Sequence, residues 1–157
     1  MSAVALLLSF RIGVVAGLRA LTAPAVVAWA IHLNWLDLGD SPLALLGSTA
    51  AVAVLTLLAL GELIADKLPS TPSRLELTGL VGRIVLGGLS GGVVAAARSH
   101  SFLLGCLAGA TGAIAGAWTG YHVRARLGRA LPLPDPAIAC VEDLVAIGGG
   151  LLTVSPF

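Results

Sequence analysis

Four acidic residues in or beside apolar stretches are the side chains best suited to carry chemistry. Glu62 and Asp66 are four positions apart, so they share one face of a helix, and Glu142 and Asp143 are adjacent in a later apolar run. Charged groups within a membrane are costly and usually pair with one another or line a path. Carboxylates grouped in this way could coordinate a cation or exchange a proton.

Basic residues accompany these carboxylates. Arg11, Arg19 and Arg83 lie in or near the same apolar stretches, and Lys67 directly follows Asp66. We expect Arg19, Arg83 and Lys67 to join the four carboxylates in a site that binds or transports a small solute or ion. Arg11 would be a further counter-ion. Two alternatives stay open: a solvated helix end at Asp66 and Lys67, and charged pairs that only fix the helix packing of a structural or assembly protein.

Other chemical motifs are missing from the sequence. It has no nucleophile elbow, phosphate-binding loop, dinucleotide fingerprint or zinc motif. The three histidines have no ligand partner at metal spacing and are expected near the membrane interface: His32, His100 and His122. We therefore expect no cofactor and no enzyme activity. A metal-dependent lipid-modifying enzyme with carboxylate ligands is the weakest alternative, and a metal site is left undetermined.

The composition identifies the environment of this 157-residue chain. Hydrophobic residues make up 57% and charged residues 11%, with a net charge of +1. The mean hydropathy is +1.00. Soluble domains carry about 25% charged residues, so a soluble enzyme and a disordered chain are excluded. A net charge of +1 gives no basic footprint for nucleic acid. The sequence predicts an all-α membrane protein, a single transmembrane domain over residues 1–157 with the lipid bilayer as a partner.

Five apolar stretches predict a compact bundle of about five transmembrane helices, since about 20 residues cross a bilayer. The loops after the second and fourth stretches hold five Lys and Arg residues, and those after the first and third hold one. Positive residues stay cytoplasmic, so we expect the N-terminus inside, the C-terminus outside and the acidic residues near the cytoplasmic side. The stretches are Ile12–Leu18 with Ala20–Leu36, Leu43–Gly61, Leu75–Ala97, Ser101–Tyr121 and Pro136–Val154.

Three segments are candidates for breaks within these helices. The first apolar stretch is too long for one untilted span, and Arg19 interrupts it. Thr22 is suited to be the N-cap of a new helix, with Pro24 in its first turn. Gly87–Gly92 and Gly148–Gly150 are two further weak points. The alternative for these glycines is that they let neighbouring helices pack closely.

Sequence similarity within the chain predicts a weak two-helix repeat. Arg11–Leu18 resembles Arg83–Leu89, with one extra residue in the first copy. Each copy is followed by a span that ends in a charged loop containing Leu-Pro, at Leu68-Pro69 and Leu131-Pro132. Parallel repeats of this kind occur in transporters.

A regular spacing of glycines predicts close helix packing in the fourth stretch. Glycines four positions apart let two backbones approach each other in lipid. Such faces could form a homo-oligomer, or they could all be used within one protomer. The glycines concerned are Gly105, Gly109, Gly112, Gly116 and Gly120.

Three runs of residues together resemble a known family: Gly17–Pro24, Gly61–Pro69 and Glu142–Gly150. The second, with the spacing Glu-x-x-x-Asp-Lys-x-Pro, is the most specific. They are similar to the bacterial integral-membrane family catalogued as domain of unknown function four-one-two-six, in its shorter Gly/Ala-rich branch. The resemblance covers most of the chain and implies a bacterial inner-membrane location, but it brings no established activity. It marks four residues for testing: Glu62, Asp66, Lys67 and Pro69.

Overall fold

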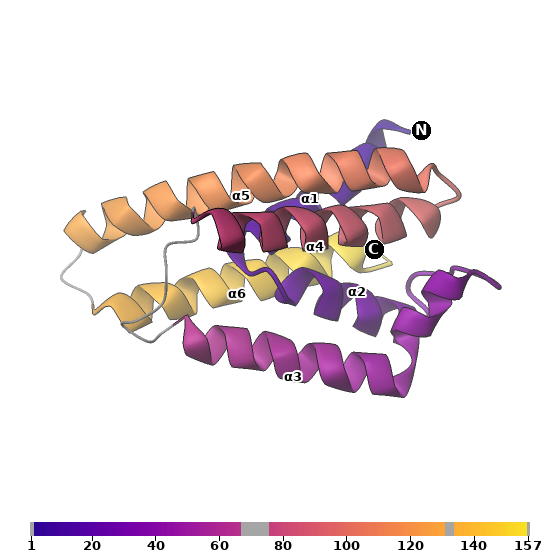
Figure 1. The fold of residues 1–157 in the computed structure, drawn as a ribbon, viewed down its shortest axis with the longest axis horizontal. Coiled ribbons are helices and arrows are strands. Elements are labelled where there is room, and N and C mark those ends of the chain that lie inside the picture. The colour runs from indigo at the N-terminus through magenta and orange to yellow at the C-terminus, as the bar shows by residue number, and fades with distance from the viewer. Residues whose placement is uncertain (1, 67–75, 131–133, 157) are drawn as a thin grey trace.

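The structure is a computed structural model that describes residues 2–66, 76–130 and 134–156. The described part of the chain is all-helical (Figure 1). Its elements are α1 (Ala3–Leu18), α2 (Thr22–His32), the 3-10 helix η1 (Pro42–Gly47), α3 (Thr49–Ala65), α4 (Leu77–Ala96), α5 (Phe102–Ala130) and α6 (Asp135–Val154).

The six α-helices alternate in direction along one bundle (Figure 1). Helix α1 ends because Arg19 adopts an extended conformation, with φ −140° and ψ 106°. The chain then turns back over Arg19–Leu21, and α2 returns beside α3. At one end of this pair Glu62 contacts the turn, and at the other His32 Nδ1 lies 2.8 Å from the carbonyl oxygen of Gly47. The first apolar stretch is therefore a helical hairpin.

This hairpin confirms the predicted break near Arg19 and corrects its details. Thr22 is the first residue of α2 and not its N-cap; the cap position is Leu21, whose side chain makes no capping hydrogen bond. Pro24 lies in the first turn of α2, as expected. The prediction of five crossings treated the two arms of the hairpin as one continuous span, because hydropathy reports apolar length and not direction.

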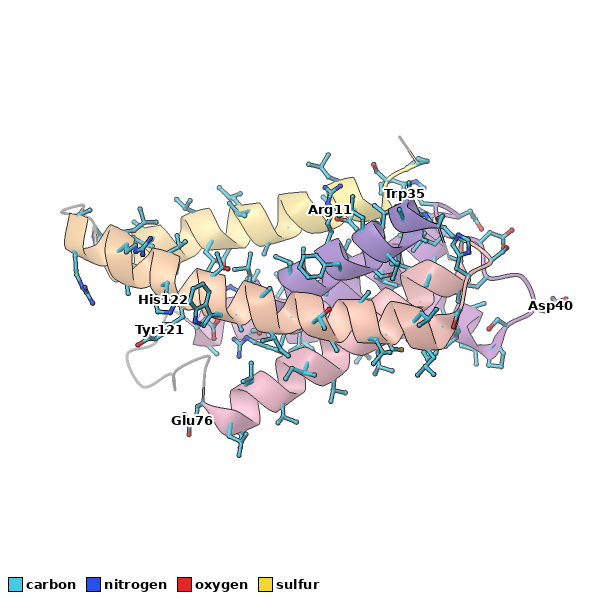
Figure 2. All side chains as sticks on the ribbon, turned by 90° about the horizontal axis from the view of Figure 1, so that it is seen from above. Arg11, Trp35, Asp40, Glu76, Tyr121 and His122 are labelled. Carbon is cyan, nitrogen blue, oxygen red and sulfur yellow. The ribbon has the colours of Figure 1, made fainter. Side chains whose placement is uncertain are left out.

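The reversal also changes where the chain ends lie. Both termini are at the same end of the bundle (Figure 1), and Ser2 Oγ lies 3.0 Å from His100 Nε2. If the helices cross a bilayer, this arrangement does not fit an N-terminus and a C-terminus on opposite sides. Helix α3 ends, α4 begins, α5 ends and α6 begins at the other end (Figure 1). Figure 2 shows this separation, with Asp40 at one end and Glu76 towards the other.

Three helices are long and apolar enough to cross a membrane: α4, α5 and α6. Helices α1, α2 and α3 are apolar but shorter, with 16, 11 and 17 residues. At 1.5 Å per residue they measure about 24, 16 and 26 Å. The structure thus supports an all-helical membrane protein, without defining five spans.

At the other two candidate breaks the helices are continuous. Helix α4 continues through Gly87–Gly92, and α6 continues through Gly148–Gly150. The α4 glycines instead let α5 pack closely against α4. A Cβ on Gly91 would lie 2.6 Å from the carbonyl oxygen of Gly105. Glycine in an apolar helix can mean a hinge or a close contact, and the partner helix decides which.

A glycine seam joins α1, α4 and α5, where α5 runs parallel to α1 and antiparallel to α4. A Cβ on Gly13 would overlap the backbone of Gly109, and one on Gly109 would overlap the carbonyl of Gly87. Ser9 Oγ also donates to the carbonyl oxygen of Gly91 at 2.9 Å. The five glycines singled out on α5 are all buried: Gly105, Gly109, Gly112, Gly116 and Gly120. Four of them contact α1 or α4 of the same chain: Gly105, Gly109, Gly112 and Gly116.

The predicted two-helix repeat is wrong. Two α-helices, α2 and α3, separate the Arg11–Leu18 segment from the first Leu-Pro sequence, whereas α5 alone follows the Arg83–Leu89 segment. The two units therefore differ in their number of helices. Small residues in apolar helices resemble one another by composition, which explains the false similarity.

Candidate functional site

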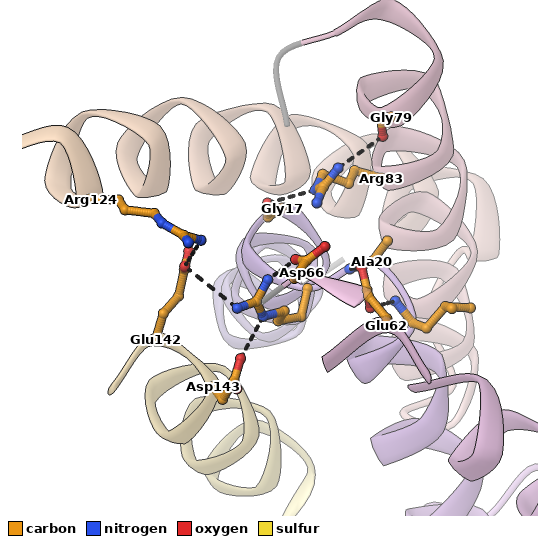
Figure 3. A network of polar contacts seen from close by, with 11 residues as sticks. Gly17, Ala20, Glu62, Asp66, Gly79, Arg83, Arg124, Glu142 and Asp143 are labelled. Carbon is orange, nitrogen blue, oxygen red and sulfur yellow. Dashed lines mark hydrogen bonds and ion pairs between the residues drawn. The ribbon is translucent and has the colours of Figure 1, made fainter. Parts of the chain in front are cut away.

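Arg19 is the centre of a cluster of charged side chains at the turn between α1 and α2. Figure 3 shows its partners Asp66, Glu142 and Asp143. The side chain of Arg19 is fully buried. Its Nε donates to Asp143 Oδ1 at 2.7 Å, Nη1 pairs with Asp66 Oδ2, and Nη2 lies 3.8 Å from Glu142 Oε2. One guanidinium thus faces three carboxylates from two helices. Its planar fork of five donors suits such an arrangement better than an ammonium group would.

The local backbone explains how α3 and α6 present these acids. Asp66 is the C-cap of α3, where its N–H closes the last turn on the carbonyl oxygen of Glu62 at 2.9 Å. Glu142 and Asp143 lie within α6, about two turns after its start at Asp135. The acidic side chains are 11–15% exposed, so water reaches them only marginally.

Glu62 binds backbone groups of the turn. Its Oε1 accepts from the N–H of Ala20 and its Oε2 from the N–H of Leu21, both at 2.8 Å. The first N–H groups of a helix have no partner within that helix, and the helix dipole favours an anion there. Leu21, the N-cap residue, makes no side-chain capping hydrogen bond, and Glu62 of α3 instead binds its N–H and that of Ala20 directly before it. Sequence reasoning placed Glu62 near the cytoplasmic end of its helix but did not foresee this role.

Arg83 performs the complementary task for α1. It is 8% exposed, and its Nε donates to the carbonyl oxygen of Gly17 at 3.2 Å while Nη1 donates to that of Gly79 at 3.3 Å. The last carbonyls of a helix lack partners within it. The hairpin turn is thereby held by a cation at the end of α1 and by an anion at the start of α2.

Arg124 is a member of the cluster that the sequence analysis assigned to a loop. Its Nη1 lies 3.7 Å from Glu142 Oε2, so Glu142 stands between Arg124 and Arg19. Helix α5 reaches Ala130 and does not end near Tyr121 as expected. The sequence does allow this longer helix, since no proline interrupts the chain between Tyr121 and Pro132.

The structure gathers most of the predicted site residues in one place. We use the term Arg19 cluster for Arg19, Glu62, Asp66, Arg83, Arg124, Glu142 and Asp143. Four carboxylates and three guanidiniums give these seven side chains a formal charge of −1 when all are ionised.

Two other predicted residues, Lys67 and Arg11, are not members of the Arg19 cluster. Lys67, with Pro69, lies outside the described residues. Arg11 is exposed near the middle of α1, about two turns before Arg19, so it is not the counter-ion that was expected. Figure 2 shows it away from Tyr121 and His122, which lie towards the clustered end.

The comparisons with known proteins give one match. No curated protein and no solved structure matches the chain. A family model, described as Domain of unknown function (DUF4126), matches residues 6–155 and so includes every member of the Arg19 cluster. The chain therefore belongs to the DUF4126 family.

Proposed function

We propose that the protein is a small integral membrane transporter that binds a proton or a small cation at the Arg19 cluster. The observation that carries this proposal is the fully buried Arg19, which sits in a non-helical turn and pairs with acids of two separate helices. Buried ion pairs contribute little net stability, and well-packed apolar residues often replace them without loss. The presence of ionisable groups in the interior of a membrane protein therefore indicates that they serve its function.

The charge balance favours a cation over an anion as the ligand. The cluster has one more carboxylate than guanidinium groups, and Asp66 and Asp143 share the same arginine. A proton or cation that neutralises Asp66 weakens its pair with Arg19. This releases the end of α3 from the turn.

Helix α3 is suited to such a movement. Its only buried residues are Val52 and Ala59, so it packs on the bundle along one narrow line. At its end, Glu62 and Asp66 attach it to the hairpin turn. Binding at the cluster can therefore change the position of α3 while the glycine seam stays in place.

We propose that the clustered end faces the cytoplasm of a bacterial inner membrane. Helix α5 ends there with Arg124, Arg126 and Arg129, and positive residues remain inside. Both termini then lie outside. A homo-oligomer would need faces other than the glycine seam, which is occupied within the protomer.

Ion flux into proteoliposomes tests the transport proposal. Wild-type protein should move protons, Na⁺ or K⁺ down an imposed gradient, read with a pH-sensitive dye or with ion-selective electrodes. Asp66→Asn should reduce this flux to that of empty liposomes. The matched control is Asp40→Asn, an exposed acid at the other end of the bundle, which should transport as wild type. Flux in a folded Asp66→Asn variant equal to wild type would refute the proposal.

A structural or assembly role is the second candidate. Glu62 and Arg83 bind backbone groups at the turn, an arrangement that stabilises a hairpin without any ligand. This role predicts earlier melting of cluster variants, no flux and no ligand-dependent stabilisation. The described residues contain no group of three His, Cys, Asp or Glu arranged to hold a metal ion, so the metal-dependent enzyme gains no support. For the same reason we propose a proton ahead of a metal cation as the species that the Arg19 cluster binds.

A further inference from the structure

A cleft of about 210 Å³ lies between α5 and α6, directly beside the Arg19 cluster. Its walls are aliphatic side chains, with Val123 and Leu127 on α5 and Val141 and Val145 on α6. Arg124 and Glu142 are the charged residues of the lining. Val141 and Val145 are 55% and 59% exposed, so the cleft is open on its outer side.

The cleft exists because α1 is short. Helix α5 uses its glycine face for α1 and α4, and α1 stops at Leu18, which lines the inner end of the cleft. Apart from Leu18, all the described residues that line the cleft belong to α5 and α6. The outer parts of these two helices are joined across the space by the contact between Arg124 and Glu142 (Figure 3).

On the membrane orientation proposed above, the cleft would lie at the boundary between lipid tails and headgroups. Counting about 20 residues of α5 from Phe102 covers the hydrocarbon core and ends near Tyr121. Trp118 and Tyr121 are exposed on this part of the helix, and such aromatic side chains sit at the interface. Arg124 lies one turn further out, at headgroup level, while Val145 lies one turn of α6 further from the cytoplasmic end than Glu142.

We propose that this cleft binds an anionic phospholipid of the bilayer, with the phosphate on Arg124 and an acyl chain between the aliphatic walls. Basic pockets between helices on the cytoplasmic side are suited to anionic headgroups. Exposed Arg126 on the same segment adds to the attraction. The phosphate competes with Glu142 for Arg124, and Glu142 is also 3.8 Å from Arg19. Lipid occupancy is thereby coupled to the charge balance of the cluster.

Native mass spectrometry and melting of the purified protein test this site, with phosphatidylglycerol compared against phosphatidylcholine. Phosphatidylglycerol should bind more tightly and raise the melting temperature of wild type, because a ligand of the folded state stabilises it. Arg124→Gln should weaken phosphatidylglycerol binding about tenfold, the effect of losing one charge-assisted hydrogen bond. Its control is Arg129→Gln, an equal change of charge at an exposed position, which should retain binding.

Two further variants, Val145→Trp and Glu142→Gln, test whether lipid binding requires the cleft or only the positive charge on the surface. Val145→Trp fills the cleft and should reduce lipid binding without changing any charge. Its control, Leu152→Trp, lies 68% exposed on the far half of α6 and should bind as wild type. Glu142→Gln removes the competitor for Arg124 and should tighten binding.

The inference is overturned if both lipids bind equally, if Arg129→Gln weakens binding as much as Arg124→Gln, or if inorganic phosphate alone stabilises the protein as well as phosphatidylglycerol does. It is also overturned if Val145→Trp leaves phosphatidylglycerol binding unchanged. Binding is measured here without ion flux, so failure of this site and failure of the transport proposal give different results.

Discussion

The bundle holds its helices together in two different ways. In the glycine seam, α1, α4 and α5 touch backbone to backbone, with Gly13 against Gly109 and Gly91 against Gly105. At the Arg19 cluster, α3 and α6 are joined to the hairpin by long charged side chains. The seam depends on the absence of side chains, and the cluster depends entirely on them.

This difference indicates which half of the molecule can change state. Backbone contacts in the seam have no alternative partner, so any displacement loses close packing. An ion pair can exchange its partner for a proton, a cation or a lipid phosphate, and its strength depends on those competitors. We therefore expect the seam to act as a frame and α3, which the cluster attaches to the hairpin turn, to be the adjustable part.

The largest effect is expected from breaking the seam with Gly109→Val. A side chain at this position would overlap the carbonyl of Gly87, so α4 and α5 must separate. Overpacking costs about 1–3 kcal/mol in ordinary cores and more where backbone must move. We expect aggregation in detergent, or a melting temperature far below wild type, measured by size-exclusion chromatography and thermal unfolding.

A matched control lies on α4. No atom lies within 4 Å of a Cβ built on Gly82, so Gly82→Ala should fold as wild type and gain slightly from helix propensity. Wild-type melting of Gly109→Val would show that the seam is not the rigid part.

The second-largest loss of stability is expected from Arg19→Gln. Removal of one partner leaves Asp66 and Asp143 facing each other in a buried site, and breaking buried pairs costs about 3–5 kcal/mol. Addition of Asp143→Asn should restore part of this loss, because residues in one network couple. Arg11→Gln is the control, since Arg11 is an exposed arginine on α1, the helix that ends directly before Arg19. Additive losses in the double variant would mean that the two residues are not coupled.

The sequence predicts which residues form the glycine seam and the Arg19 cluster better than it predicts how the helices carrying them are arranged. Spacing and charge identified Arg19, Glu62 and Asp66, and the interruption at Arg19 indicated a break. The direction of the chain after this break could not be predicted from the sequence. It depends on Glu62 and Arg83, which bind the turn from distant parts of the chain. The role of Gly87–Gly92 was equally undetermined, since it depends on the helix that packs against it.

A smaller effect is expected from Glu62→Gln. One amide oxygen replaces two carboxylate oxygens, so either Ala20 or Leu21 loses its acceptor. A lost backbone hydrogen bond at a helix start costs about 1–2 kcal/mol. Hydrogen exchange should accelerate at the start of α2 and stay unchanged in α5. Equal acceleration in both helices would mean that Glu62 supports the whole bundle and not the turn.

The smallest effect is expected from Thr56→Val, which tests how α3 is attached. Trp29 Nε1 donates to Thr56 Oγ1 at 3.0 Å across the α2–α3 contact, and both side chains are partly accessible. The net value of such a bond is about 1 kcal/mol or less, so the melting temperature should hardly change. Because α3 buries only Val52 and Ala59, the loss should appear locally, as faster hydrogen exchange in α3 with α1 and α5 unaffected. If melting falls as far as in Gly109→Val, α3 belongs to the frame, and the division between a fixed seam and an adjustable cluster is wrong.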